Sequence, residues 1–188
     1  MKYFEQLKKR IHELDELKDD LVRKSIRVTR LSKSVVYSLI RDDFENAERI
    51  LNEMKEIVNE LKKVVNEHPQ FHYNIRIALQ EYAEAAIFYQ YLKNEKIPTH
   101  EDLGVDELSY INGLIDFCGE LFRKIVEELI KDNVSFVIKA KKTIEDIYMK
   151  MLYIEFREYE IRRRVDNLQN ILNKISERLL ERKLSKGL

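Results

Sequence analysis

The chain has 188 residues, of which 44% are hydrophobic and 36% are charged, so it is long enough to bury one sizeable core. Lys and Arg together number 34, as do Asp and Glu, and the zero net charge indicates neither an acidic nor a basic partner. One cysteine excludes an internal disulfide, and no apolar run approaches the roughly 18 residues that a membrane span needs. We therefore expect a cytoplasmic protein that does not enter a membrane.

Helix-breaking residues are rare in this chain, with 4 glycines and 2 prolines. No stretch rich in Gly, Ser or Pro marks a linker, and apolar residues recur at helical rather than alternating spacing. These features predict an all-α fold in which residues 1–188 form a single domain. We expect an antiparallel array of six or seven helices.

The first half of the chain predicts three helices. A helix-spaced apolar stripe indicates a long helix over about residues 3–39. Asp42 and Asp43 suit the N-cap of a second helix. That helix runs to about Glu67, because the ring of Pro69 removes an N–H group and restricts the preceding residue. A third helix ends near Lys93.

The second half begins with the loop IPTHEDLGV, residues 97–105, which contains both Pro98 and Gly104. In this loop Thr99 and Asp102 have the spacing of a capping box. A fourth helix is predicted over about residues 106–131, and the sequence DNVS breaks it. The remaining residues, 136 to about 183, are predicted to be helical with an interruption near residues 157–160.

Two glutamates stand out in LQEYAEAAIFYQYL, residues 79–92, because Glu81 and Glu84 are its only charged side chains. They lie in one helical row with Ile77 and Phe88. The opposite face of the same helix is also apolar, and consists of Ile75, Ala78, Leu79, Tyr82, Ala85, Ala86, Tyr89 and Leu92. A helix that is apolar nearly all round predicts burial of the two acids or their placement in a cleft.

The fourth helix repeats this pattern. In LSYINGLIDFCGELF, residues 108–122, the only charges are Asp116 and Glu120, which lie four residues apart on one face. Gly113 and Gly119 flank Asp116 on neighbouring turns, which suits a site where a facing helix or a ligand comes close.

Four acids in weakly solvated helices repel one another and raise each other's pKa values unless a cation is near. A divalent metal would satisfy both pairs, and all-carboxylate ligation suits Mg²⁺ or Mn²⁺. The chain contains no Glu-x-x-His, so a ferritin-like di-iron centre is not favoured. The alternative is that the acids are buried and neutralised by cations such as Arg76 and Arg123.

A basic row on the first helix predicts contact with nucleic acid. Residues 21–40 contain no acid, and the basic side chains include Arg23, Arg27, Arg30 and Lys33. Such a row can neutralise phosphates. It is equally typical of a solvated face or of a subunit contact, and residues 162–164 form a second, less specific arginine cluster.

The chain resembles the translin family, and in particular the archaeal branch related to translin-associated factor X. The resemblance rests on four stretches in order: residues 21–41, 79–92 and 108–123, and the tail from residue 154. The two middle stretches are the most specific, with Gln80, Glu81, Tyr82, Glu84 and Ala85 in the first. The second holds Asp116, Gly119, Glu120 and Leu121. Two departures, Ile26-Arg27 in the first stretch and Asp132-Asn133 after the fourth helix, bear on RNA contacts more than on the acids.

This resemblance implies a function. We expect a Mg²⁺- or Mn²⁺-dependent endoribonuclease that cleaves single-stranded RNA inside a hollow homo-oligomer, most simply an octamer. Its metal ligands and catalytic groups are expected to be Glu81, Glu84, Asp116 and Glu120. Its nucleic-acid-binding residues are expected to be Arg23, Arg27, Arg30, Lys33 and Arg76, with His68 and His72 near the RNA by analogy. The alternatives are a non-catalytic protein that binds single-stranded RNA or DNA, as translin does, and an oligomeric scaffold.

Overall fold

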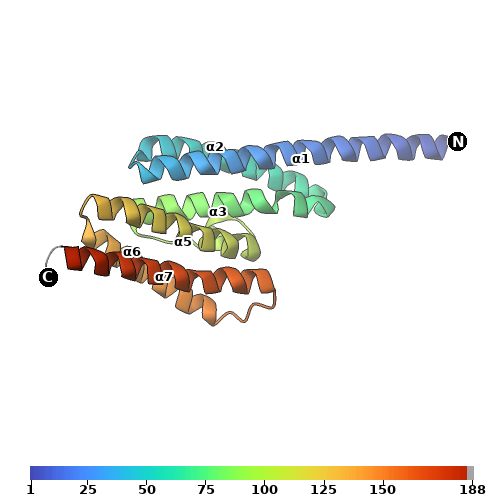
Figure 1. Ribbon diagram of the computed structural model, residues 1–188. Coiled ribbons are helices and arrows are strands. Elements are labelled where there is room, and N and C mark those ends of the chain that lie inside the picture. The colour runs from blue at the N-terminus through green and yellow to red at the C-terminus, as the bar shows by residue number, and fades with distance from the viewer. Residues whose placement is uncertain (186–188) are drawn as a thin grey trace. The chain divides into compact units, whose positions relative to one another are not determined.

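The computed structural model describes residues 1–185 and is helical throughout that range (Figure 1). It contains seven α-helices and one 3₁₀ turn, η1, and no strand among the described residues. The elements are α1 (Lys2–Ile40), α2 (Phe44–Glu67), η1 (Pro69–Phe71), α3 (His72–Asn94), α4 (His100–Leu103), α5 (Glu107–Ile130), α6 (Val134–Leu152) and α7 (Tyr159–Ser185). The predicted all-α fold and helix count are confirmed. None of these helices combines the length and apolar character of a membrane span.

The helix ends follow the local signals of the sequence. The Asp43 side chain caps α2 by accepting a hydrogen bond from the backbone N–H of Asn46 at 3.2 Å. Asp42 is not a cap but adopts a left-handed conformation, with φ of 63°, that turns the chain. The predicted capping box forms between Thr99 and Asp102, and it starts the short helix α4 inside the predicted loop.

The second half of the chain differs slightly from the sequence prediction. α6 ends at Leu152, so the interruption covers residues 153–158 and lies a few residues earlier than expected. Asn133 caps α6 through a hydrogen bond from the backbone N–H of Phe136. The predicted break between two helices is confirmed, and only its position differs by a few residues. Helix boundaries are the least reliable part of a prediction from sequence.

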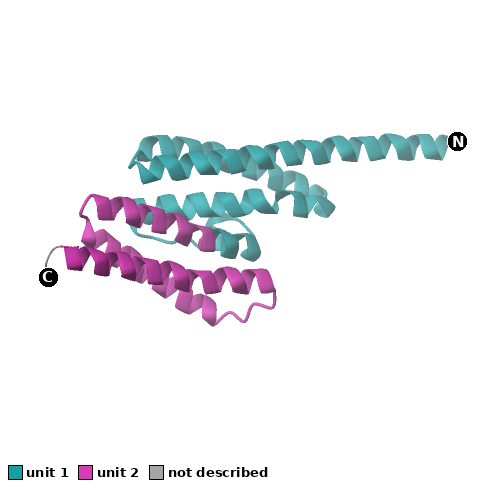
Figure 2. Cartoon of the chain, viewed as in Figure 1, with its two compact units in different colours: residues 1–113 teal, residues 114–188 magenta. Residues whose placement is uncertain are grey.

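The chain divides into two compact units, of which the described parts are residues 1–113 and 114–185, and the border lies within α5 (Figure 2). The predicted single domain remains a prediction. In the first unit, α1 packs along both α2 and α3. Its core includes Val28, Leu39, Met54, Leu61 and Phe88. In the second unit, α6 packs along α7, and the core includes Phe117, Leu121, Ile144 and Leu168.

Two buried serines join α1 to α3. The Ser25 hydroxyl donates a hydrogen bond to the carbonyl oxygen of Asn74 at 3.1 Å, and the Ser32 hydroxyl donates to that of Glu81 at 3.2 Å. Both serines are small enough for the two helix backbones to come close. They therefore hold the turn of α3 that begins with Glu81 against α1.

A buried ion pair lies in the second unit. Lys124 is 2% exposed and Glu128 is 7% exposed, and their charged groups are 3.3 Å apart. Glu128 also accepts hydrogen bonds from Lys131 at 3.0 Å and from the Asn133 amide at 2.7 Å. Burial opposes ionisation of Glu128, but the hydrogen bonds outweigh it and hold its pKa below the usual range.

We predict that Glu128→Gln costs about 3–5 kcal/mol of unfolding free energy, because it removes the carboxylate charge that lies 3.3 Å from the buried Lys124 ammonium group. Since the pKa of Glu128 is lowered in the fold, its stabilisation is complete above its unfolded pKa of about 4.3 and is lost as the pH falls through the folded value. Chemical denaturation at neutral pH measures the loss. The matched control is Glu160→Gln, which breaks an exposed pair with Arg163 at 2.9 Å and should cost at most about 1 kcal/mol. Equal costs for the two variants would contradict the prediction.

Candidate metal and nucleic-acid site

The two acids of α3 lie where the helix passes from the surface into the core. Glu84 is 8% exposed, Glu81 is half-buried, and the neighbouring Phe88 is fully buried. At the other end of the same row Ile77 is exposed. The predicted burial is therefore confirmed for Glu84, whereas Glu81 lies at the border with solvent. All members of the predicted apolar face are buried except Leu92, which is half-buried.

The first turns of α5 come unusually close to this part of α3. A Cβ atom on Gly113 would lie 2.7 Å from the carbonyl oxygen of Gln80, 2.8 Å from the Cβ of Ala83 and 2.9 Å from the backbone nitrogen of Glu84. Only glycine fits between two backbones at these distances. The expectation of a close helix contact is confirmed for Gly113. At Gly119 an added Cβ would meet no described atom within 4 Å, so helix packing does not explain that glycine.

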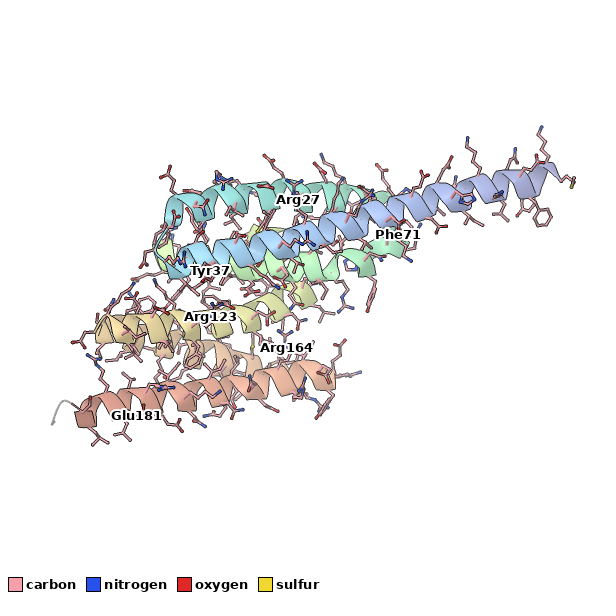
Figure 3. The ribbon with its side chains drawn as sticks, turned by 45° about the horizontal axis from the view of Figure 1, so that its top comes forward. Arg27, Tyr37, Phe71, Arg123, Arg164 and Glu181 are labelled. Atoms are coloured by element: carbon pink, nitrogen blue, oxygen red, sulfur yellow. The ribbon has the colours of Figure 1, made fainter. Side chains whose placement is uncertain are left out.

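The two acids of α5 belong to the second unit, and each has an arginine partner there. Glu120 accepts a hydrogen bond from Arg123 at 2.7 Å, as the structural alternative expected. Asp116 forms an ion pair with Arg164 of α7. Figure 3 labels both arginines, on α5 and α7. Cations therefore compensate this pair of acids at least in part.

The ion pair between Arg164 and Asp116 was not predicted from the sequence. Arg164 was grouped with Arg162 and Arg163 in one basic cluster, but those two side chains are exposed and Arg164 is not. Helical periodicity is the signal that could have identified Arg164 as a partly buried residue. Arg164 lies three residues after the buried Ile161 and next to the buried Val165, on the apolar face of α7.

Burial and charge both act on Glu120. Its pKa is raised by burial and by the nearby Asp116 carboxylate, and Arg123 only partly opposes the shift. Burial and the Asp116 carboxylate also raise the pKa of the Cys118 thiol, so this buried residue serves packing rather than chemistry. A cation bound near Glu120 would compete with a proton for this carboxylate.

The four acids cannot be described as one cluster. Within residues 1–185 the structure assembles no group of three or more His, Cys, Asp or Glu side chains able to hold a metal ion. Glu81 and Glu84 lie in the first unit, and Asp116 and Glu120 lie in the second. The four-carboxylate site thus stays a prediction.

The basic row of α1 divides into two kinds of residue. Arg27 forms a 2.6 Å ion pair with Glu53 of α2, and Arg23 hydrogen-bonds Asp20 at 3.4 Å. Both side chains therefore have acidic partners within the same chain (Figure 3 labels Arg27). Arg30 and Lys33 are exposed on α1. They are the members of the row best placed to meet a phosphate.

A pocket of about 210 Å³ opens beside the exposed end of the α3 row. It is lined by Tyr73, Arg76, Ile77, Gln80, Ser109 and Asn112, all in the first unit. Tyr73 is 77% exposed, and the guanidinium carbon of Arg76 lies 5.7 Å from the centre of its ring. An exposed ring beside an arginine suits stacking against a nucleobase. Arg76 was predicted to bind nucleic acid, whereas Tyr73 and Asn112 were missed.

His68 and His72, which were expected near the RNA by analogy with the family, lie at junctions between helices. The Nε2 atom of His72 lies 3.8 Å from the Asp106 carboxylate, which also accepts hydrogen bonds from the backbone and hydroxyl of Ser109. His72 therefore joins the start of α3 to the start of α5. His68 occupies the position between α2 and η1 and makes no side-chain capping hydrogen bond to η1.

Helices of this arrangement, with acids in otherwise uncharged segments of α3 and α5, define an α-helical protein of the translin type. The translin family matches residues 16–186, and the chain belongs to this family. The crystal structure of apo-NeC3PO is 40% identical and superposes with a TM-score of 0.91, over 94% of this chain and 95% of that one.

Two further comparisons extend this result. The crystal structure of AfC3PO is 22% identical with a TM-score of 0.89, over 99% of this chain and all of that one, and it shows the same fold. An AfC3PO–duplex RNA complex is also 22% identical, with a TM-score of 0.87 and 97% of each chain covered. An uncharacterized protein of Methanocaldococcus jannaschii is 28% identical over 164 residues, which are 85% of this chain and 73% of that protein.

The two glycines of α5 give a matched test of the helix contact. Gly113→Ala should destabilise the fold by about 1–3 kcal/mol, because its Cβ would collide with the backbone of α3. Gly119→Ala should instead stabilise it by up to about 1 kcal/mol through helix propensity. Thermal or urea unfolding of both variants measures the difference. A Gly113→Ala protein as stable as the parent would refute the close contact.

Proposed function

We propose that this protein is a divalent-metal-dependent endoribonuclease that cleaves single-stranded RNA within a homo-oligomer. The observation that carries the proposal is the burial of Glu84 in an otherwise uncharged stretch of α3, in a chain that belongs to the translin family. A carboxylate with so little exposure keeps its charge only where a cation or hydrogen bonds stabilise it. The RNA complex of AfC3PO supports RNA as the ligand class.

The proposed ligands are Glu81, Glu84, Asp116 and Glu120. Their donor set consists of carboxylate oxygens, which fit Mg²⁺ or Mn²⁺ and suit zinc or iron less well. When bound, the metal would polarise the scissile phosphate and lower the pKa of an attacking water. If Glu120 leaves the metal to the other three carboxylates, it can accept the proton of that water, and its raised pKa suits this role.

The chain's own residues connect the two helices of this proposal. Gly113 contacts the turn of α3 between Gln80 and Glu84, and it precedes Asp116 by three residues in the same helix. Arg123 and Arg164 neutralise the α5 acids while no metal is bound. A metal that takes over the Glu120 carboxylate would let the Arg123 guanidinium bind a substrate phosphate instead.

Binding of the RNA strand requires cations and stacking surfaces. The exposed Arg30 and Lys33 would neutralise phosphates, and Tyr73 with Arg76 would hold a base next to the Glu81 turn. Arg23 and Arg27 would join them by exchanging their acidic partners for phosphates.

The assembly is part of the proposal. Large apolar side chains remain exposed on several helices, among them Tyr37, Ile130, Ile138 and Met149. Surfaces of this kind mark protein contacts. We propose a homo-oligomer, with the octamer implied by the family as its size, working in the cytoplasm.

A non-catalytic protein that binds single-stranded RNA or DNA is the second candidate. The ion pairs Asp116–Arg164 and Glu120–Arg123 favour it, because they give two of the four acids a structural role. Incubation of a labelled single-stranded RNA with purified protein, in Mg²⁺ or in EDTA, separates the candidates. Cleavage that requires the metal supports the nuclease, whereas binding without cleavage supports the second candidate.

Removing the charge of the α3 acids should abolish the chemistry and spare the fold. Glu81→Gln and Glu84→Gln keep the side-chain volume, so each should weaken Mg²⁺ binding and lower cleavage by about 100-fold or more. Melting temperatures in EDTA should stay close to that of the parent, and the rise on adding Mg²⁺ should be lost. Glu56→Gln, which alters an exposed acid of α2, is the control. A large loss of stability in EDTA would instead show that these acids are structural.

The exposed cations should dominate RNA affinity. Replacing Arg30 and Lys33 with Ala should reduce the slope of log affinity against log salt by about 1.4, or about 0.7 for each lost phosphate contact. Binding of RNA of any sequence should weaken alike, as fluorescence anisotropy over a salt series would measure. The control is Lys55→Ala, which removes an exposed cation of α2. An unchanged slope in the double variant would remove α1 from the RNA surface.

A further inference from the structure

The first half of α1 forms an arm, defined here as residues 2–20. α1 is 39 residues long, and Figure 1 shows its N-terminal part running beyond α2 and α3. All residues from 1 to 13 are exposed, and the first buried residue of the helix is Leu21. An isolated helix of this length is marginal in water, so the arm needs a partner for its apolar residues.

The arm has a continuous apolar stripe. Tyr3, Phe4, Leu7 and Ile11 are between 39% and 71% exposed, and Leu14 and Leu17 follow at helical spacing. This stripe continues the face that α1 buries from Leu21 onward. The spacing of three and four residues is that of a two-helix seam. The arm therefore presents the same kind of surface that α1 uses in the core, but without α2 or α3 to cover it.

The charges of the arm select the orientation of a partner helix. Its first half carries Lys2, Lys8, Lys9 and Arg10 against one acid, Glu5, and its second half carries Glu13, Asp15, Glu16, Asp19 and Asp20 against one base, Lys18. A parallel copy would place like charges together. An antiparallel copy would place the basic half of each arm beside the acidic half of the other, which favours that arrangement.

We propose that the arms of two copies of this chain pair as an antiparallel two-helix coiled coil with its two-fold axis near Ile11. At 100° per residue Lys8 and Asp15 lie on one flank of the stripe, while Arg10 and Glu13 lie on the other. An axis between residues 11 and 12 brings Lys8 opposite Asp15 of the second copy and Arg10 opposite Glu13 of the second copy. Each ion pair then occurs twice, as an isologous interface requires.

This interface goes beyond the proposed nuclease and does not depend on it. The family match begins at residue 16, so most of the arm lies outside the part of the chain that defines the family. A paired arm would join two copies by a contact that leaves α3 and the pocket at Tyr73 untouched. RNA cleavage by the variants below should equal that of the parent, so failure of either proposal can be recognised separately.

Disulfide trapping tests the pairing, because the chain's one cysteine, Cys118, is buried. Ile11→Cys in the full chain should form an intermolecular disulfide under mild oxidation, since residues near the axis come within the roughly 7 Å between Cα atoms that a disulfide allows. Phe4→Cys should not cross-link, because its two copies would be about 22 Å apart along the helices. His12→Cys, on the opposite face, is the second control. Cross-linking of Phe4→Cys as efficient as that of Ile11→Cys would show a parallel pair, and no cross-linking of Ile11→Cys would refute the pairing.

Charge reversal provides an independent readout on the Ile11→Cys chain. The double substitutions Lys8→Glu with Arg10→Glu, and Glu13→Lys with Asp15→Lys, should each lower the yield of the disulfide at least several-fold. An equal mixture of the two proteins should restore it as a mixed dimer, because one arm is then acidic and the other is basic. Yields that do not change with these substitutions would overturn the proposed orientation.

Discussion

The close contact between α5 and α3 at Gly113 is the constraint on which the candidate site depends. A side chain at this position would collide with backbone and Cβ atoms between Gln80 and Glu84, so the two helices cannot separate or rotate here without losing their packing. The contact adds to the two hydrogen bonds that α1 makes with the carbonyl groups of Asn74 and Glu81 in α3. The turn that this contact fixes is the one that carries Glu84, whose side chain is 8% exposed.

The acids show how burial and compensation differ between neighbouring helices. In the second unit, arginines reach both acids, and the raised pKa of Glu120 shows that this compensation is incomplete. Such a carboxylate is stabilised by a proton or by a second cation. In the proposed chemistry, a metal ion would therefore bind carboxylates whose charge Arg123 and Arg164 already balance in part.

Much of the fold could be predicted from local signals in the sequence. Helical periodicity, Pro69, the cap at Asp43 and the capping box at Thr99 predicted the long helices and most of their ends, whereas the short elements α4 and η1 were not predicted. The uncharged setting of Glu84 predicted its burial. The partner of Asp116 could not be predicted, because Arg164 lies 48 residues away and only tertiary packing brings them together. Tyr73 was missed for a similar reason, since the pocket beside it needs Ser109 and Asn112 from another helix.

The two serine bonds between α1 and α3 also restrict how the chain can change in length. Ser25 and Ser32 are seven residues apart, and so are the carbonyl groups of Asn74 and Glu81 that accept their hydrogen bonds. Two helices that run side by side are thereby matched over one full heptad. A residue inserted between the serines would turn one of them by about 100° away from its acceptor. Insertions and deletions should therefore be excluded from these two segments during divergence and confined to the turns, such as residues 153–158.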